Sequence, residues 1–377
     1  MMQIGRTDTS HIARWWWTVD RWSLAAVMLL VAVGSLLALA ASPPVAVRLG
    51  YESFHFVYRQ VMFLGPSLAV LFGVSLLGPR DIRRLSVVIL GVGLILVAVT
   101  PYFGPEVKGA HRWIKFGPLS LQPSEFLKPA FVVVISWMFS EQAKGEGVPG
   151  NAIAVALLVL TMALLVRQPD IGQTALISIV FGAVFFVAGL PLLWVGSLGA
   201  GGVIGLELAY NYMPHFTSRV DRFLNPASGD TFQVDTARDA FMTGGLWGRG
   251  PGEGIVKRVL PDAHTDYIFA VAGEEFGLAL CLVLVALFAF VVMRGFARVM
   301  QTSDHFSQLA GTGLVVLFGL QAVINMAVNL DLMPSKGMTL PFISYGGSSM
   351  LALALGMGML LALTRRRVGP VYGGNEE

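Results

Sequence analysis

One short segment of the chain places a carboxylate directly before a long apolar run. Residues 260–269 read LPDAHTDYIF, so Asp266 lies near the predicted N-terminus of a helix. An Asp or Thr at that position commonly caps a helix, and the helix dipole favours a negative charge there. The same dipole would keep Asp266 ionised and ready to take a proton from a hydroxyl group. Both interpretations are open, and His264 is a candidate for orienting Asp266 or for a second base.

A second segment combines an acid and a base on one predicted helix. Residues 122–128 read QPSEFLK, and Ser124 is the predicted N-cap. Glu125 and Lys128 are three residues apart, so they share a helix face and can pair. Ionisable residues inside a membrane span are costly and usually face a cavity, although a purely structural ion pair is the alternative. Arg112, in the preceding HRW segment, is a further candidate cation.

Two further segments carry candidate site residues. Residues 167–172 read RQPDIG and predict a tight turn, in which Asp170 is either a helix cap or a site residue. Residues 334–349 read PSKGMTLPFISYGGSS and contain Lys336 and Ser344. Their two prolines and three glycines predict an irregular, cavity-lining entry to the last span, because irregular backbone is tolerated at membrane depth only when it is shielded.

Two other patterns are weaker. Residues 248–254 read GRGPGEG, but no Gly-Lys-Ser/Thr follows, so this is no Walker-type phosphate loop. A flexible or re-entrant loop is predicted there. The His and Cys residues lack the spacing of zinc ligands.

The elements that must position these residues are apolar helices. Of the 377 residues, 55% are hydrophobic and 13% are charged, whereas about a quarter of a soluble protein is charged. About ten stretches are long enough, at roughly 20 residues, to cross a bilayer, and they are apolar on every face, unlike barrel strands. The predicted fold class is all-α: a polytopic membrane protein with about ten transmembrane helices. The stretches begin near Trp22, Val61, Leu85, Phe126, Ala152, Ile171, Leu192, Tyr267, Ser307 and Pro341.

Three regions follow from this reading. Residues 1–21 are a predicted cytoplasmic segment, residues 22–364 a single membrane domain, and residues 365–377 a cytoplasmic tail. Residues 213–265 form one long extracytoplasmic loop between spans seven and eight. The first apolar run, 24–41, exceeds the ~7–15-residue core of a signal peptide, so a retained helix is expected.

The positive charges predict the orientation. Four groups of arginines flank spans on one side of the ten-span model, which makes both termini cytoplasmic. The groups are Arg6, Arg14 and Arg21; Arg80, Arg83 and Arg84; Arg294 and Arg298; and Arg365, Arg366 and Arg367.

Other cations fall on the outer side, against the charge rule. Either they meet lipid phosphates and nearby acids, or they form a basic cavity for an anionic ligand such as a phosphate. Their spread over separate loops argues against nucleic-acid binding. Seven lie in or beside short loops, namely Arg48, Arg59, Lys108, Arg112, Lys115, Arg167 and Lys336, and six lie in the long loop, which is exempt from the rule: Arg219, Arg222, Arg238, Arg249, Lys257 and Arg258.

Together, the motifs PDAHTD, QPSE and LPFISYGGSS resemble those of the SEDS family, the shape, elongation, division and sporulation proteins of bacteria. The resemblance runs from the first span to the last. Ala263 before His264 and the PSKGMT run look like the FtsW-like division members rather than the RodA-like elongation members. One departure is residues 232–238, FQVDTAR, where many relatives have a Gln-x-x-Gln-Ser pattern.

The resemblance implies a peptidoglycan glycosyltransferase that polymerises lipid II at the outer face of the cytoplasmic membrane, at the division septum. Its implied partners are lipid II, the nascent glycan, a class B penicillin-binding protein that cross-links, and other division proteins. The family's essential aspartate maps onto Asp266. The implied substrate-binding residues are Arg112, Glu125, Lys128, Asp170, His264, Lys336 and Ser344.

The expected chemistry needs one base and several cations. Lipid II carries its sugar on a pyrophosphate, which leaves readily, so charge stabilisation matters more than the second carboxylate of a glycosidase. Asp266 would accept the proton, while Arg112, Lys128 and Lys336 would stabilise the pyrophosphate. The sequence leaves open a divalent cation, Mg²⁺ or Mn²⁺, bridging Asp266 and phosphate oxygens. Two rival functions are a lipid II flippase and a non-enzymatic division scaffold.

Overall fold

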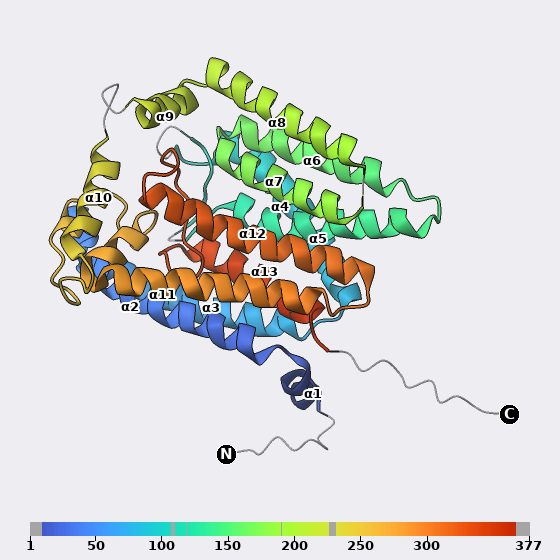
Figure 1. The fold of residues 1–377 in the computed structure, drawn as a ribbon, viewed down its shortest axis with the longest axis horizontal. Helices are drawn as coiled ribbons and strands as arrows, with labels where there is room; N and C mark the ends of the chain where they lie inside the picture. The colour runs from blue at the N-terminus through green and yellow to red at the C-terminus, as the bar shows by residue number, and fades with distance from the viewer. Residues whose placement is uncertain (1–9, 107–109, 118, 190, 226–230, 367–377) are drawn as a thin grey trace.

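The computed structural model describes residues 10–106, 110–117, 119–189, 191–225 and 231–366, and within them the chain forms a helical bundle (Figure 1). Ten of the helices in this described part contain 17 residues or more, as the predicted number of apolar stretches requires. They are α2 (Arg21–Arg48), α3 (His55–Ser75), α4 (Pro79–Phe103), α5 (Pro123–Lys144), α6 (Gly150–Arg167), α7 (Ile171–Val187), α8 (Leu192–Tyr212), α11 (Ile268–Val299), α12 (His305–Asn329) and α13 (Gly347–Leu363).

Shorter elements lie outside these ten helices. The short helix α1 precedes α2, a two-stranded antiparallel hairpin joins α4 to α5, and further short helices lie between α8 and α11. The predicted long loop is therefore partly helical, and the expected all-α fold contains one small hairpin. Their bounds are α1 (His11–Thr18), β1 (Ile114–Phe116), β2 (Leu119–Leu121), α9 (Pro214–Leu224), α10 (Phe232–Gly244) and η2 (Val256–Arg258).

The long helices begin at most six residues from the predicted starts. Six of them, α2, α3, α4, α6, α11 and α12, are long and apolar enough to span a membrane by length and composition alone. Helices α7 and α13 are apolar but shorter. The membrane class is thus confirmed, while the exact number of spans stays a prediction.

The start of the last helix differs from the prediction. Helix α13 begins at Gly347 rather than near Pro341. The intervening residues form a turn, in which the Ser344 hydroxyl accepts a hydrogen bond from the Leu340 amide at 2.7 Å and Phe342 has a φ of 61°. The irregular entry that the prolines and glycines predicted is therefore present.

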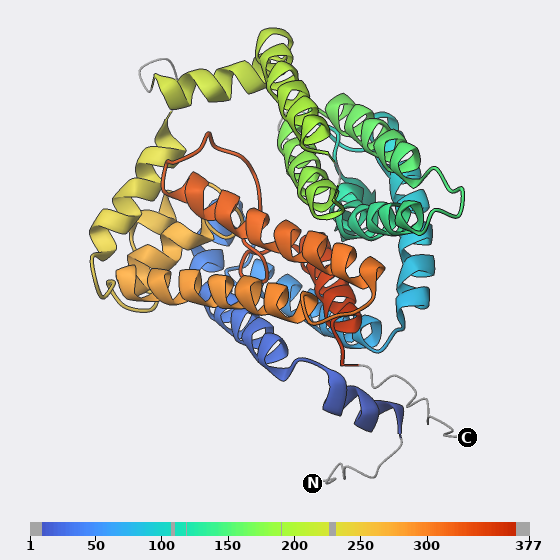
Figure 2. The same cartoon turned by 45° about the vertical axis from the view of Figure 1, so that its right-hand side comes forward.

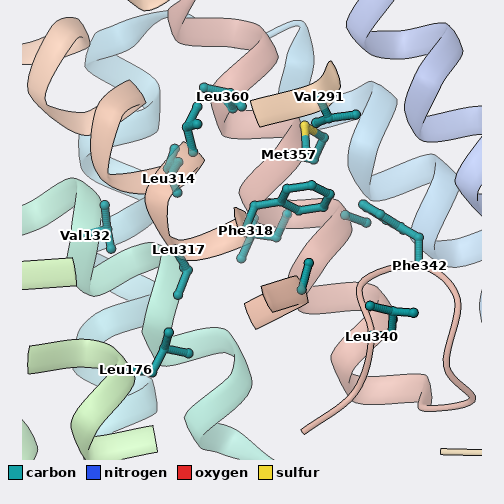
Figure 3. Packing of buried hydrophobic residues seen from close by; sticks show 14 of the residues in the cluster. Val132, Leu176, Val291, Leu314, Leu317, Phe318, Leu340, Phe342, Met357 and Leu360 are labelled. Atoms are coloured by element: carbon teal, nitrogen blue, oxygen red, sulfur yellow. The ribbon is translucent and has the colours of Figure 1, made fainter. Parts of the chain in front are cut away.

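The helices pack in two groups around a shared centre. Helices α6–α8 lie on one side of the molecule and α2 and α3 on the other (Figure 2). Helix α12 packs against α5, α7, α11 and α13, and α13 also packs against α3 and α5. Buried apolar side chains from α5, α7, α11, α12, α13 and the preceding loop meet there (Figure 3).

The outer surface of the bundle is also apolar, as expected of a protein in lipid. On α4, the side chains of Val88, Val92 and Ile95 are 62%, 51% and 64% exposed. These residues fall on one helix face, and water would not favour leaving such a face uncovered. The bundle thus presents an apolar surface where hydrocarbon would lie.

The glycine-rich segment packs into a break in α11. Gly277 has a φ of 71° inside that helix, which frees backbone groups on both sides of the kink. The loop satisfies them: the Arg249 amide donates to the Glu274 carbonyl at 3.0 Å, and the Leu278 amide donates to the Gly245 carbonyl at 2.9 Å. The predicted flexible or re-entrant loop is in fact held by backbone hydrogen bonds to a membrane helix.

Candidate active site

A cavity of about 570 Å³ lies at one end of the helical bundle. Its walls come from α3, α5 and α7, from the β1–β2 region, from α9 and α10, and from the segments that precede α11 and α13. Six separate stretches of the sequence therefore converge on it, and they include all four of the candidate segments. The charged residues that line it are Arg59, Arg112, Lys115, Arg219, Lys336, Glu125, Asp170, Asp262 and Asp266.

Asp266 lines this cavity and does not cap the helix after it. Tyr267 is the N-cap of α11, and no side chain makes the cap hydrogen bond. The backbone carbonyl of Asp266 accepts hydrogen bonds from the side-chain amides of Asn325 at 2.9 Å and Asn329 at 2.8 Å. Two residues of α12 thus fix the turn that carries the carboxylate, and the simple capping interpretation of Asp266 is wrong.

The carboxylate of Asp266 lies against the backbone of the segment that precedes α13. A Cβ atom placed on Gly337 would stand 3.0 Å from the Asp266 Oδ2 atom. A glycine at this position therefore leaves room beside the carboxylate. Lys336, the next residue along the chain, lines the same cavity.

Lys336 is the most unusual cation in the cavity. Its Nζ atom is shielded from solvent and makes no hydrogen bond within the described part of the chain. Burial lowers the pKa of Lys336 to about 7, although Asp170 opposes this effect. The lysine stem packs on Gly172, where an added Cβ would stand 1.6 Å from Nζ. An anion entering the cavity would meet a cation that still needs a partner.

Arg112 and Asp170 form an ion pair at the cavity wall. The Arg112 Nε atom lies 3.7 Å from Asp170 Oδ2, and Arg112 also donates to the backbone carbonyls of Gln168 and Pro169. Asp170 caps α7 by accepting a hydrogen bond from the Gln173 amide at 3.3 Å. Asp170 is thus both a cap and a wall residue, and the two alternatives from the sequence are compatible.

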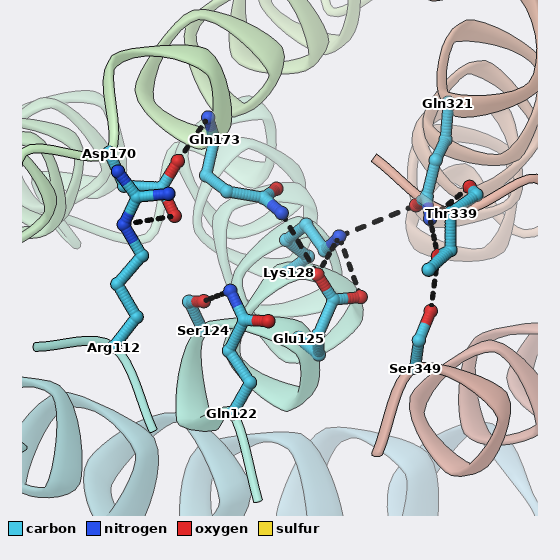
Figure 4. A network of polar contacts seen from close by, with 10 residues as sticks. All are labelled: Arg112, Gln122, Ser124, Glu125, Lys128, Asp170, Gln173, Gln321, Thr339 and Ser349. Atoms are coloured by element: carbon cyan, nitrogen blue, oxygen red, sulfur yellow. Dashed lines mark hydrogen bonds and ion pairs between the residues drawn. The ribbon is translucent and has the colours of Figure 1, made fainter. Parts of the chain in front are cut away.

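Glu125 and Lys128 belong to a buried polar network beneath the cavity (Figure 4). The Lys128 Nζ atom donates to both Glu125 oxygens at 2.9 Å and to Gln321 Oε1 at 3.3 Å. Gln173 donates to Glu125 Oε1 at 2.9 Å. Glu125 lines the cavity and Lys128 does not, so Lys128 is connected to the cavity through Glu125.

The network also reaches the segment that carries Lys336. Gln321 donates to the carbonyl and hydroxyl oxygens of Thr339 at 3.3 and 3.4 Å. Thr339 in turn shares a 2.7 Å hydrogen bond with Ser349 of α13. Ser124 is not the N-cap that the sequence predicted, because Gln122 occupies that position and donates to Ser124 Oγ at 3.2 Å.

His264 and Ser344 do not line the cavity, and substrate binding by these two residues stays a prediction. The His264 ring packs at 4.5 Å from the Phe56 ring and at 5.2 Å from the Tyr345 ring, measured between centroids. The Ser344 hydroxyl donates to the Thr265 carbonyl at 2.5 Å. Both residues join the turn before α11 to the segment before α13, because Ser344 bonds to Thr265 and the His264 ring packs on Tyr345.

Several lining residues were not among the predicted site residues. Arg59 and Lys115 were noted only as cations that break the charge rule, and Arg219 only as a cation of the long loop. Burial lowers the pKa of Arg219, and the nearby cations Arg112 and Arg222 lower it further. The signal that would have found all three was a positive charge on the predicted outer side. Lys108, another such cation, lies outside the described residues.

A divalent cation in the cavity would have to be held mainly by the bound substrate. Among the residues that the structure describes, no three His, Cys, Asp or Glu side chains are grouped as a metal site requires. Asp266 is a single carboxylate beside glycine backbone. Within the described ranges, the side chains alone therefore do not form such a grouped metal site.

An apolar cleft adjoins the polar cavity. It runs between α5, α12 and α13, and Glu125 borders both spaces. Its walls include Leu314, Phe318, Leu353 and Leu360. This apolar space has a volume of about 30 Å³, so it is too small for a hydrocarbon chain.

Comparisons with known proteins agree with this architecture. The family model described as "Cell cycle protein", which covers FtsW, RodA and SpoVE, matches residues 21–368. A Caulobacter vibrioides protein named "Probable peptidoglycan glycosyltransferase FtsW" is 51% identical over 374 residues, covering 99% of this chain and 95% of the relative. A Legionella pneumophila protein of the same name is 34% identical, covering 91% and 90%.

Two solved structures have the same fold. One, from work described as "Structural coordination of polymerization and crosslinking by a peptidoglycan synthase complex", has a TM-score of 0.76 at 28% identity and covers 92% of this chain and 97% of its own. Thermus thermophilus RodA has a TM-score of 0.69 at 28% identity, covering 93% and 97%. With a family model spanning nearly the whole chain and a relative of 51% identity, the chain belongs to the SEDS family of FtsW, RodA and SpoVE proteins.

Proposed function

We propose that the chain is a peptidoglycan glycosyltransferase that polymerises lipid II. The observation that carries this proposal is the position of Asp266, a carboxylate in a cavity of about 570 Å³ that five cations also line. The names of its relatives support the same activity. A base next to a cluster of cations suits a reaction that removes a proton and releases an anion.

The reaction joins two glycan chains and releases a lipid pyrophosphate. The acceptor hydroxyl oxygen attacks the anomeric carbon of the donor sugar, and the bond from that carbon to the pyrophosphate oxygen breaks. The pyrophosphate keeps the bonding electron pair, and Asp266 takes the hydroxyl proton. Attack from the face opposite the leaving group inverts the anomeric carbon.

The cations stabilise the charge that builds up on the leaving group. Lys336, Arg112 and Arg219 line the cavity with Asp266. Fixed positive charges in a shielded site stabilise a developing anion more than water does. Lys336 has the strongest need of an anionic partner, because its ammonium group makes no hydrogen bond to the described residues.

The polyprenyl tail would lie in the hydrocarbon beside the bundle, because the apolar space between α5, α12 and α13 has a volume of only about 30 Å³. A membrane bundle is then the scaffold that such a substrate needs, because its tail remains in hydrocarbon during the reaction.

The wider setting follows from the same proposal. The cavity would face the periplasm at the division septum, with both termini in the cytoplasm. Cross-linking would need a partner penicillin-binding protein, since the sequence lacks the Ser-x-x-Lys signature of a transpeptidase. A solved relative comes from work on a complex that coordinates polymerization and crosslinking, which supports such a partner.

Turnover in detergent separates this proposal from its rivals. The purified chain is incubated with lipid II, alone and with the partner transpeptidase, and glycan length is measured on a gel. A polymerase makes glycan in detergent, where no membrane divides the solution. A flippase or a scaffold makes none under either condition, and that result would exclude the proposed activity.

A further inference from the structure

A second cavity, of about 1000 Å³, lies at the end of the bundle opposite the candidate active site. It is formed where α4 and α12 begin and where α11 and α13 end, near the α11–α12 turn on the right of Figure 1. Three separate arginine groups of the sequence converge on this one space. They contribute Arg80, Arg83, Arg84, Arg298, Arg365 and Arg366.

The two acids in the cavity wall are already engaged. Asp81 Oδ2 accepts a hydrogen bond from the Gly78 amide at 3.4 Å at the start of α4. Asp304 Oδ2 accepts from the Ser307 amide at 3.1 Å and from its hydroxyl at 2.6 Å at the start of α12. Six arginines against two acids leave an excess of four positive charges in the wall.

Acids behind the wall do not remove this excess. Arg298 Nε lies 3.2 Å from Asp20 Oδ1, and an Arg83 terminal nitrogen lies 3.7 Å from Glu141 Oε1. Each of these two acids also pairs with a second cation outside the cavity wall. Adding both acids and both second cations therefore leaves the net charge unchanged. The second cations are Arg294, 2.7 Å from Asp20, and Lys144, 2.8 Å from Glu141.

Two of the arginines are directed to the cavity without an acidic partner. Arg80 and Arg84 are exposed, lie one helical turn apart on α4, and form no ion pair with an acid that the structure describes. Arg83, between them, has a buried Nε atom that lacks a hydrogen-bond partner within the described ranges. The guanidinium of Arg83 lies 4.1 Å above the Phe306 ring, which fixes its position.

We propose that this cavity binds the phosphate headgroup of an anionic phospholipid. Basic pockets between membrane helices on the cytoplasmic side recognise such headgroups. The surface of α4 favours a lipid over a soluble anion, because Arg84 is followed on the same face by exposed Val88, Val92 and Ile95. The arginine at the cavity would bind the phosphate of the headgroup, and the apolar stripe next to it would contact the acyl chain.

The test measures lipid binding by the whole purified chain. After exchange into detergent, the chain is titrated with phosphatidylglycerol, phosphatidylcholine, inorganic phosphate and a hexaglutamate peptide, with native mass spectrometry and the thermal midpoint as readouts. Phosphatidylglycerol is expected to bind at least about tenfold more tightly than phosphatidylcholine, since two or more cations contribute. The double variant Arg80→Gln/Arg84→Gln should lose this affinity roughly thirtyfold, at about fivefold per arginine.

A matched double variant provides the control. Arg14→Gln/Arg21→Gln removes the same charge near the same end of the bundle, from exposed residues that do not line the cavity. It should keep the preference for phosphatidylglycerol, as should Arg80→Lys/Arg84→Lys. Equal losses in the two glutamine variants would show diffuse surface attraction and overturn the site. Tighter binding of phosphate or hexaglutamate than of phosphatidylglycerol would overturn the choice of a lipid.

Discussion

Asp266 and Lys336 line the same cavity but are held in different ways. The backbone of Asp266 is fixed by the two asparagines of α12, so its carboxylate has a defined position without any ligand. Lys336 is held by packing against Gly172, and its ammonium group forms no hydrogen bond within the described residues. A preorganised base beside a cation that needs a counter-ion is the arrangement that the proposed transfer requires.

The lowered pKa of Lys336 predicts a pH-dependent affinity for pyrophosphate. Burial brings this pKa to about 7, so the ammonium form prevails below pH 7 and the neutral amine above it. Affinity for a polyprenyl pyrophosphate should therefore fall between pH 6 and pH 8.5, relative to a Lys336→Gln variant. The difference should reach roughly tenfold, the contribution of one charged hydrogen bond. Calorimetric titration of both proteins across this range measures it.

The stability of the ligand-free chain should change in the opposite direction. Between the folded pKa of about 7 and the ordinary value of 10.5, the unfolded chain holds the Lys336 proton more tightly. Stability therefore rises with pH in this window. Lys336→Gln should raise the thermal midpoint most below pH 7. Identical pH profiles of affinity in the two proteins would contradict this role of Lys336.

At the residue scale, the sequence predicted the kinds of side chain better than their directions. Asp266, Arg112 and Lys336 were expected in the site and do line the cavity. His264 is only two residues from Asp266, yet its ring packs against Phe56. A turn sends neighbouring side chains to different sides, and its geometry depends on contacts with distant segments. Sequence spacing alone therefore could not separate the two.

At the element scale, α7 controls the position of Lys336. Replacing Gly172 with Ala would place a Cβ 1.6 Å from the lysine Nζ, so the flexible lysine must move while the helix backbone stays. Gly172→Ala should thus reduce glycan synthesis about as much as Lys336→Gln does, and it should not lower the thermal midpoint. Gly182→Ala, on the same helix with nothing near its added Cβ, should leave synthesis unchanged. Equal activity of the two alanine variants would argue against this contact.

The break in α11 gives a second test at this scale. Gly248 and Gly252 have φ values of 80° and 85°, so alanine strains the backbone at both by about 1–2 kcal/mol. Only at Gly248 would the new Cβ meet the Glu275 carbonyl oxygen, at 2.1 Å. Chemical unfolding should show Gly248→Ala to be less stable than Gly252→Ala by about 1–3 kcal/mol. Equal stability would mean that the loop does not pack into the break.

The sequence predicted the long apolar helices well and the connecting elements poorly. Helices α7 and α8 begin at the predicted residues because a continuous apolar run defines each of them. The kink at Gly277 lies inside such a run, so hydropathy gives no sign of it. Helices α9 and α10 lie outside the spans and depend on contacts with distant segments, which a pattern of apolar residues does not reveal.

For the whole molecule, the charge pattern separates two ends of the bundle. Six arginines predicted to be cytoplasmic line one cavity, and five cations predicted to be extracytoplasmic line the other. The charge rule applies to each loop separately, so the sorting of cations between the two ends could be predicted from the loop sequences. The pairing of specific loops around each cavity was not, because it depends on how the helices pack.

This orientation can be measured in intact cells. Cys281 is the single cysteine in the sequence, so a Cys281→Ser background leaves only introduced cysteines to react. Glu253→Cys, in the exposed loop beside α11, should react with a membrane-impermeant maleimide from outside. Lys144→Cys, at the end of α5, should react only after the membrane is permeabilised. The reverse pattern would place the candidate active site in the cytoplasm.

The most direct test of the account converts the carboxylate of Asp266 into an amide, with an amino group in place of one oxygen. Asp266→Asn keeps the size of the side chain but removes the base, and Asp331→Asn makes the same change outside the cavity. The rate of glycan synthesis from lipid II by each purified protein is measured together with its thermal midpoint. The account predicts a loss of at least about a hundredfold for Asp266→Asn, at an unchanged midpoint, and a near-normal rate for Asp331→Asn. A folded Asp266→Asn protein that retains more than a tenth of the wild-type rate would contradict the central claim.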